Sequence, residues 1–311
     1  MSAPPVVAAV DGSDDSLRAL DWALDAARLR GAPLRVVHVR QYAAWTQPDV
    51  LVAGPPAGAD DTVLDAARAH VEDRDRTDVE GPDRGGDGAG VEYVGLDGLP
   101  GALLLELGAT AQLLVLGSRG RGGFASLLLG SGGLAAARDA ECPVVVVPRP
   151  GREVHGDAPA GPGPRVVVGL HVDSPDDAVL AFAFAEAARR GARVQAVAAY
   201  PWPTRTWAPA GELPAPPVDQ SEVESEIRSL AEGFLAPHRA RHPDVPADTE
   251  ILPGDAAGRL VAASRDADLV VVGRHRRRLL APARMMGSVT QAVLLHAASP
   301  VAVVPPSPPQ E

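Results

Sequence analysis

The sequence predicts an α/β protein built from two tandem domains, each a doubly wound parallel sheet flanked by helices. Short Val-rich segments that are apolar throughout alternate with longer amphipathic segments, as expected of buried parallel strands covered by helices on both faces. The chain has 311 residues, about two domains at typical domain size. Its second half repeats the order of segments of its first half, and we therefore expect two copies of one fold.

The first part of the repeat is an ungapped match of residues 6–40 to residues 166–200. Each of these segments has the pattern of an apolar strand, a polar turn, an amphipathic helix and a second strand. The helices are expected to end at Gly31 and Gly191, because glycine adopts the left-handed conformation that closes many helices. We expect the first helix to begin near Asp14.

The later part of the repeat contains a strand followed by a glycine-bearing loop, and then a final strand. LLVLGSRG at 113–120 aligns with LVVVGRHR at 269–276. ECPVVVVP at 141–148 aligns with ASPVAVVP at 298–305. Together with the first part, these matches predict about five strands and four helices in each copy.

A segment rich in Pro and Gly separates the two copies. Residues 149–164 show no apolar periodicity and are typical of a linker. We therefore expect domains at 1–148 and 165–311.

Charge and residue usage exclude several classes of function. With 29 basic and 40 acidic residues the formal net charge is −11, which argues against a nucleic-acid partner or an anionic membrane surface. The chain contains no lysine, so neither a phosphate-loop lysine nor a Schiff-base lysine is available. The single cysteine, Cys142, suits a reducing compartment. No signal-length apolar run stands near the N-terminus, and we expect a cytoplasmic protein.

The glycine-dense stretch at 117–133 has three interpretations. A mononucleotide phosphate loop requires GxxxxGK[ST], which a chain without lysine cannot supply. A dinucleotide fingerprint, GxGxxA, is matched at 120–125, but it follows a late strand, and the next strand ends at Pro148 instead of an acidic residue. We interpret that match as a coincidence in a glycine-rich stretch.

The third interpretation is a loop of fixed length, Gly117-x2-Gly120-x9-Gly130-Ser131, that joins a strand end to a helix start. Glycines at the strand end would let the backbone approach a ligand, and the unpaired N–H groups of the helix start suit an anion. The hydroxyl of Ser131 is placed either to donate to a phosphate or to cap the helix. Asp11 follows the first strand and is placed either to shape the turn or to contact a ligand; its position at the same sheet edge favours the ligand.

This spacing resembles the ATP-binding signature of the universal stress protein family. VDGSDDS at 10–16 and CPVVVVP at 142–148 are also similar to that family, and the resemblance covers nearly the whole chain in a tandem-domain form. It implies a five-stranded parallel sheet in the order 3-2-1-4-5 and pairing of domains through the last strand. The resemblance thereby implies a homodimer or an intramolecular pseudo-dimer.

In the ATP-binding branch of that family, the resemblance implies a nucleotide held without fast hydrolysis. It implies ATP as the cofactor, with Mg²⁺ as a candidate accompanying ion. By the same resemblance, Asp11 contacts the adenosine portion, Gly117 and Gly120 lie beside the ribose and phosphates, and Gly130 and Ser131 donate to phosphate.

The two copies depart from the family pattern in different places. In the first copy Gly132 and Gly133 stand where the family has an apolar residue and then Ser or Thr. In the second copy His171 replaces the acidic residue and Arg276 replaces the second glycine, although Gly-Ser-Val-Thr at 287–290 keeps the phosphate-side hydroxyls. We therefore expect ATP binding in the first copy alone.

The leading hypothesis is a stress-response regulator that binds ATP in its N-terminal domain. The alternative is a dimerisation scaffold in stress signalling that binds no nucleotide, and slow ATP hydrolysis is a third option. No catalytic residues are recognised from spacing. His238 and His242 lack an evident third metal ligand, and Pro237 and Pro243 argue against a long helix there, so we expect no metal site.

Overall fold

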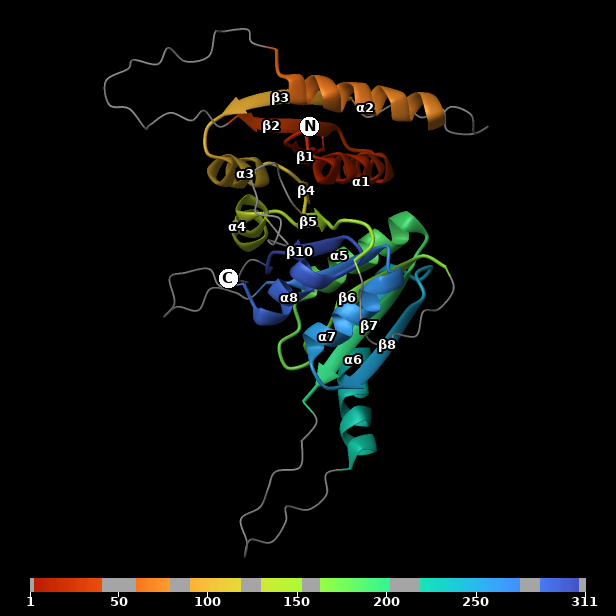
Figure 1. Cartoon of the computed structure of the whole chain (residues 1–311). Coiled ribbons are helices and arrows are strands. Elements are labelled where there is room, and N and C mark those ends of the chain that lie inside the picture. The colour runs from red at the N-terminus through yellow and green to blue at the C-terminus, as the bar shows by residue number, and fades with distance from the viewer. Residues whose placement is uncertain are drawn as a thin grey trace, which may run out of the picture. The chain divides into compact units, whose positions relative to one another are not determined.

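The computed structural model describes residues 3–40, 60–78, 90–118, 130–152, 163–201, 219–274 and 286–307. The chain divides into two compact units, Met1–Pro150 and Gly151–Glu311. Figure 1 colours the first unit from red to yellow-green and the second from green to blue. Each unit is a parallel sheet with helices packed against it, which confirms the predicted fold class.

The first unit has the strand order β3-β2-β1-β4-β5, with every described pair of neighbouring strands parallel. This confirms the order 3-2-1-4-5 that the resemblance implied. The elements of the unit are β1 (Val6–Val10), α1 (Asp14–Arg30), β2 (Leu34–Arg40), α2 (Thr62–Asp78), β3 (Val91–Asp97), α3 (Pro100–Gly108), β4 (Leu113–Gly117), α4 (Ser131–Asp139) and β5 (Val144–Val147).

The second unit repeats this order as β8-β7-β6-β9-β10, again with parallel neighbours. Its elements are β6 (Arg165–Gly169), α5 (Asp177–Arg190), β7 (Arg193–Tyr200), α6 (Gln220–Arg241), β8 (Ala247–Pro253), α7 (Ala256–Ala263), the 3₁₀ turn η1 (Ser264–Asp266), β9 (Leu269–Gly273), α8 (Ser288–His296) and β10 (Val301–Val304).

Helix α6 contradicts the expectation that flanking prolines prevent a long helix. It runs for 22 residues with Pro237 inside it. The proline removes one backbone donor near the end of the helix, but Ala231, Leu235 and His238 on the same helix are buried. Burial of this face outweighs the missing hydrogen bond, and the helix continues to Arg241.

The core of the first unit is built from Val, Leu and Ala. The side chains of β4 and β5 are almost all buried, because helices cover both faces of a doubly wound sheet. Helix α1 turns Ala19, Ala23 and Ala27 inward, and these small side chains let its backbone lie close to the strands. None of the helices in the described ranges is both long and apolar enough to cross a membrane.

Local chemistry sets the ends of α1 where the sequence predicts them. The Ser13 hydroxyl accepts a hydrogen bond from the Ser16 N–H at 3.2 Å, so the helix begins at Asp14. At the other end Gly31 has φ +57°, a left-handed conformation that glycine adopts without strain. Gly191 ends α5 in the same way at φ +59°. The connection from β1 into its helix is therefore short and well defined.

Candidate functional site

The candidate site lies at the carboxyl edge of the first sheet, where β1 and β4 are neighbours. The chain leaves β1 through α1 toward β2 on one side, and leaves β4 through α4 toward β5 on the other. Such a change of direction is where ligands bind in open α/β sheets. Asp11 follows β1, Gly117 ends β4, and Gly130 directly precedes α4, so the structure brings these predicted residues to one edge.

Asp11 shapes the turn between β1 and α1. Its Oδ1 accepts hydrogen bonds from the Ser13 N–H at 3.0 Å and from the Ser13 hydroxyl at 2.6 Å. Its own N–H donates to the Ser16 hydroxyl at 3.3 Å, and Gly12 adopts φ +78° within the turn. This is the Asx-type turn that the sequence allowed as one interpretation. The turn fixes the Asp11 side chain at the edge, and its contact with a ligand stays a prediction.

Gly117 is required by a close approach between β4 and α1. A Cβ on Gly117 would lie 2.6 Å from the carbonyl oxygen of Asp15 and 3.0 Å from the N–H nitrogen of Ser16. Both contacts are to backbone atoms, which cannot rotate away. The sequence attributed this glycine to the approach of a ligand; the structure supplies a packing reason for it.

The glycine loop is closed at its base by backbone hydrogen bonds. Gly130 donates to the Ser118 carbonyl at 3.1 Å, and Ser118 donates to the Val147 carbonyl at 2.9 Å. Gly120 and the other residues of 119–129 lie outside the described residues. The first bond holds the end of β4 beside the start of α4, and the second joins the end of β4 to the end of β5.

The described residues leave room at the N-cap of α4. Gly130 is the N-cap residue with φ −68° and ψ 151°, and no side chain caps the helix within the described residues. A Cβ at Gly130 would meet no described atom within 4 Å. Ser131 is the first residue of α4, and its side chain lies outside what the structure describes. The first N–H groups of this helix are therefore placed to meet an anion.

A buried carboxylate that the sequence did not single out lies beside the end of β4. Asp15 is 1% exposed, and it accepts hydrogen bonds from the Ser118 hydroxyl at 3.1 Å and from Arg149 Nε at 3.0 Å. Arg18, one turn further along α1, forms an ion pair with the same carboxylate. We call Asp15, Arg18, Ser118 and Arg149 the Asp15 cluster. It joins the segments that follow β1, β4 and β5.

Opposing effects act on the pKa of Asp15. Burial acts to raise it, but hydrogen bonds from Arg149 and Ser118, together with the charge of Arg18, outweigh burial and hold the pKa below its ordinary value. Asp15 therefore stays ionised at neutral pH. The sequence assigned Arg149 to the linker, and the structure brings it into this cluster of the first unit.

A second paired carboxylate, that of Asp61, directly precedes α2 and contacts His38 near the end of β2. His38 Nδ1 lies 2.8 Å from Asp61, whose Oδ1 also accepts from the N–H groups of Val63 and Leu64 at the start of α2. Burial acts to raise the pKa of Asp61, and the hydrogen bonds from His38 and the α2 backbone outweigh it and lower the pKa. His38 is aligned with Val10 of β1, so this pair is at the same edge as Asp11.

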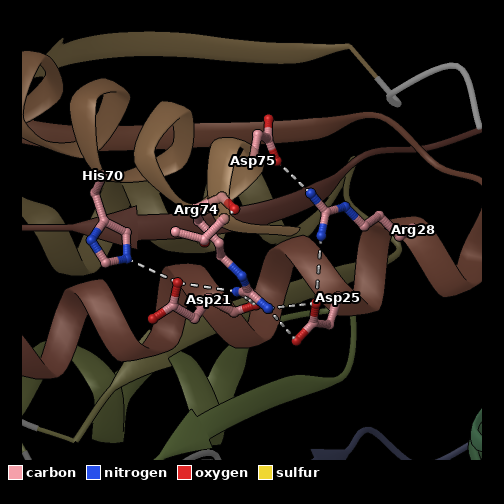
Figure 2. A network of polar contacts seen from close by, with 7 residues as sticks. Asp21, Asp25, Arg28, His70, Arg74 and Asp75 are labelled. Carbon is pink, nitrogen blue, oxygen red and sulfur yellow. Dashed lines mark hydrogen bonds and ion pairs between the residues drawn. The ribbon is translucent and has the colours of Figure 1, made fainter. Parts of the chain in front are cut away.

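Ion pairs join the outer surfaces of α1 and α2. Figure 2 shows Asp21 of α1 between His70 and Arg74 of α2, at 2.8 and 3.0 Å. Arg74 also contacts Asp25 at 2.7 Å, and Arg28 forms an ion pair with an aspartate near the end of α2. These side chains are partly exposed, so each pair adds little stability by itself. Their arrangement joins α2 to α1 along much of the length of the two helices.

The second unit differs at the matching positions. His171, at the position of Asp11, is exposed. The hydroxyl of Thr290 donates to the Gly273 carbonyl at 2.7 Å, and it thereby joins the end of β9 to α8. Gly133 has no side chain to make the corresponding bond in the first unit. Arg276 lies outside the described residues. In the described part of the chain, no group of three His, Cys, Asp or Glu side chains is placed to hold a metal ion.

Replacing Gly132 with alanine is expected to stabilise the first unit by up to about 1 kcal/mol, since glycine is a poor helix former. Gly132 lies in the first turn of α4, and its Cβ would lie 3.9 Å from Leu104, an ordinary contact. Urea unfolding measures the gain. Gly233→Ala in α6, where a Cβ meets no described atom within 4 Å, is the matched control. A loss of stability in Gly132→Ala alone would contradict the expectation.

Comparison with known proteins follows the same two-part division. The universal stress protein family model matches residues 4–148 and 164–305. A universal stress protein of Mycobacterium tuberculosis H37Rv is 35% identical over 310 residues, covering 96% of each chain. One from Mycolicibacterium smegmatis is 31% identical over 309 residues, covering 97% of each chain.

Two solved structures share the fold over most of their length. A functionally unknown protein from Pseudomonas aeruginosa PAO1 has a TM-score of 0.62 at 16% identity, covering 97% of this chain and 92% of that chain. A universal stress protein from Archaeoglobus fulgidus has a TM-score of 0.60 at 16% identity, covering 97% of this chain and 98% of that chain.

Proposed function

Because the chain belongs to the universal stress protein family, we propose that its N-terminal domain binds ATP and that the protein is a nucleotide-responsive regulator of the stress response. The observation that carries the proposal is the N-terminus of α4, which no described side chain caps, at the point where the strand order reverses. A helix start of this kind attracts a phosphate through its unpaired N–H groups and its dipole.

Three segments would contribute to this site. The turn that contains Asp11 would hold the adenosine portion, and the glycine loop from Gly117 through Gly120 would lie beside the ribose and phosphates. The N–H of Gly130 already closes the loop onto Ser118, so the phosphate would meet the N–H groups that follow it, beginning at Ser131. Mg²⁺ belongs to the proposed ligand as the counterion of the triphosphate.

We propose that only the N-terminal domain binds nucleotide. In the second domain the acidic residue is replaced by the exposed His171, and the Thr290 hydroxyl is already bonded to the Gly273 carbonyl. The second domain then acts as a structural or regulatory partner of the first. Dimerisation and a cytoplasmic location are parts of the same proposal.

Calorimetric titration of the purified chain with ATP tests the proposal through Gly130→Leu. The N-cap φ of −68° suits any residue, and the new Cβ would meet no described atom within 4 Å. We expect the unmutated protein to bind ATP at a single site and the variant to lose that binding. Phosphate release, measured in the same samples, is expected to be far slower than nucleotide exchange.

Gly287→Leu is the matched control, because Gly287 caps α8 in the second domain with nearly the same geometry, φ −61° and ψ 148°. It is expected to leave ATP binding unchanged. Thermal melting checks that both variants are folded. If the unmutated protein bound no ATP, the result would reject the proposal and favour a scaffold that works through dimerisation. Sustained turnover would instead identify an ATPase.

A further inference from the structure

We propose that Arg149 is a phosphate-binding residue of the N-terminal site and that the buried carboxylate of Asp15 positions it. The inference rests on the proposed function and deepens it, because it assigns the cation that would recognise the outer phosphates of ATP. The chain has no lysine, so a permanent side-chain cation at this site has to be an arginine. Arg149 is the second residue after β5, and β5 is the neighbour of β4. It is therefore at the same edge as the start of the glycine loop.

The contact with Asp15 uses only part of the Arg149 guanidinium. Its Nε donates to Asp15 Oδ1 at 3.0 Å, and the side chain is 54% exposed. Counting described residues only, the two terminal nitrogens of Arg149 make no hydrogen bond. A structural arginine of this chain is different: the terminal nitrogens of the buried Arg165 donate to Gln195 and to the Ala263 carbonyl. The terminal N–H groups of Arg149 therefore remain available for bidentate binding of a phosphate.

The charges in the Asp15 cluster favour an additional anion. Two arginines, Arg18 and Arg149, face a single carboxylate, and the lowered pKa of Asp15 keeps that carboxylate ionised. The Nε of Arg18 is buried and makes no hydrogen bond to any residue that the structure describes. One carboxylate therefore leaves both the charge and the donors of the two guanidinium groups partly unsatisfied. A phosphate group would supply the missing negative charge.

The second domain, whose glycine loop departs from the family spacing, lacks both the carboxylate and the arginine. Pro175 stands at the position of Asp15, and Pro306 stands at the position of Arg149. Arg274 replaces Ser118 yet keeps the backbone bond, donating to the Val304 carbonyl at 3.3 Å. The second domain thus keeps the strand order and the packing of its first helix against β9 without this pair. The same strand order therefore forms without the carboxylate and the arginine, and both occur in the copy that has the complete glycine loop.

Binding of ATP and of adenosine to Arg149→Gln tests the inference. Adenosine has no phosphate, so a phosphate-binding arginine matters only for ATP. We expect the affinity for ATP to fall by about tenfold and the affinity for adenosine to stay within about twofold. Arg28→Gln is the matched control, because Arg28 lies at the far end of α1 and forms an ion pair with Asp75. It is expected to change neither affinity.

Equal losses of affinity for ATP and adenosine, or no change in either, would overturn the assignment and leave Arg149 a structural residue. Failure of the unmutated protein to bind either ligand would instead reject the proposed function. A second measurement needs no variant: phenylglyoxal modifies exposed arginines, and mass spectrometry locates the product. We expect ATP to protect Arg149 and adenosine to leave it reactive. Equal reactivity of Arg149 with ATP and with adenosine also overturns the inference.

Discussion

Asp15→Ala is expected to lower the free energy of unfolding of the first unit by about 2–4 kcal/mol. The carboxylate is 1% exposed and is the shared acceptor for Ser118, Arg149 and Arg18. Without it the buried Ser118 hydroxyl loses its acceptor, while the two arginines are partly exposed and water can solvate them. The loss is therefore smaller than for an ion pair buried on both sides. Urea unfolding followed by hydrogen exchange reads the peptides of each unit separately.

Asp14→Ala is the matched control, because Asp14 stands in the same helical turn and is exposed. It removes the same interaction with the helix dipole, which contributes about 0.3–1 kcal/mol, and leaves the buried bonds in place. An equal loss in the two variants would contradict the structural role of Asp15.

The stability that Asp15 contributes is expected to depend on pH in one direction. Its pKa is lowered in the folded chain, so the folded state holds the proton less tightly than the unfolded state. The contribution is present above the ordinary carboxyl pKa of about 4 and is lost as the pH falls through the lower folded value. The difference between the unmutated protein and Asp15→Ala should shrink as the pH falls below about 4. A stability difference that stays constant as the pH falls would contradict this expected pH dependence.

The parts of the fold that the sequence predicted are set by local chemistry. The start of α1 follows from a hydroxyl three residues before its bonding partner, and its end follows from a glycine with positive φ. The strand order followed from the family resemblance and is confirmed in both units. Helix α6 shows the limit of this approach. A proline disfavours helix locally, but a buried face on the same helix overrides that preference, and burial is not visible from the proline alone.

The Asp15 cluster was missed because its contacts join distant parts of the chain. Ser118 is 103 residues from Asp15, and Arg149 is 134 residues from it. No periodic pattern or spacing rule connects positions so far apart. A comparison of the two copies contained a weak signal, since both Asp15 and Arg149 have proline at the matching positions. Only the fold shows that those two differences concern one contact.

Gly117→Ala is expected to destabilise the first unit by about 2–3 kcal/mol, since the added methyl group overpacks a site with no room for it. Its Cβ would lie 2.6 Å from the Asp15 carbonyl oxygen and 2.7 Å from the carbonyl carbon. Both atoms belong to the first turn of α1, so relief requires the helix to shift. That shift would also disturb the Asp15 carboxylate and its bond to Ser118. Hydrogen exchange of α1 and β4 peptides during urea unfolding measures the effect.

Gly273→Ala is the matched control in the second unit, because Gly273 ends β9 as Gly117 ends β4. A Cβ there would lie 2.9 Å from Cγ2 of Val179, so the close contact is to one side-chain atom and not to the backbone. We expect Gly273→Ala to be destabilising by about 1 kcal/mol or less, and equal effects at the two glycines would contradict the packing reason for Gly117.

The close packing at Gly117 also decides how its binding data are interpreted. Loss of ATP binding in Gly117→Ala would follow from displacement of α1 as well as from a lost ligand contact, whereas Gly130→Leu changes a position where a Cβ would meet no described atom within 4 Å.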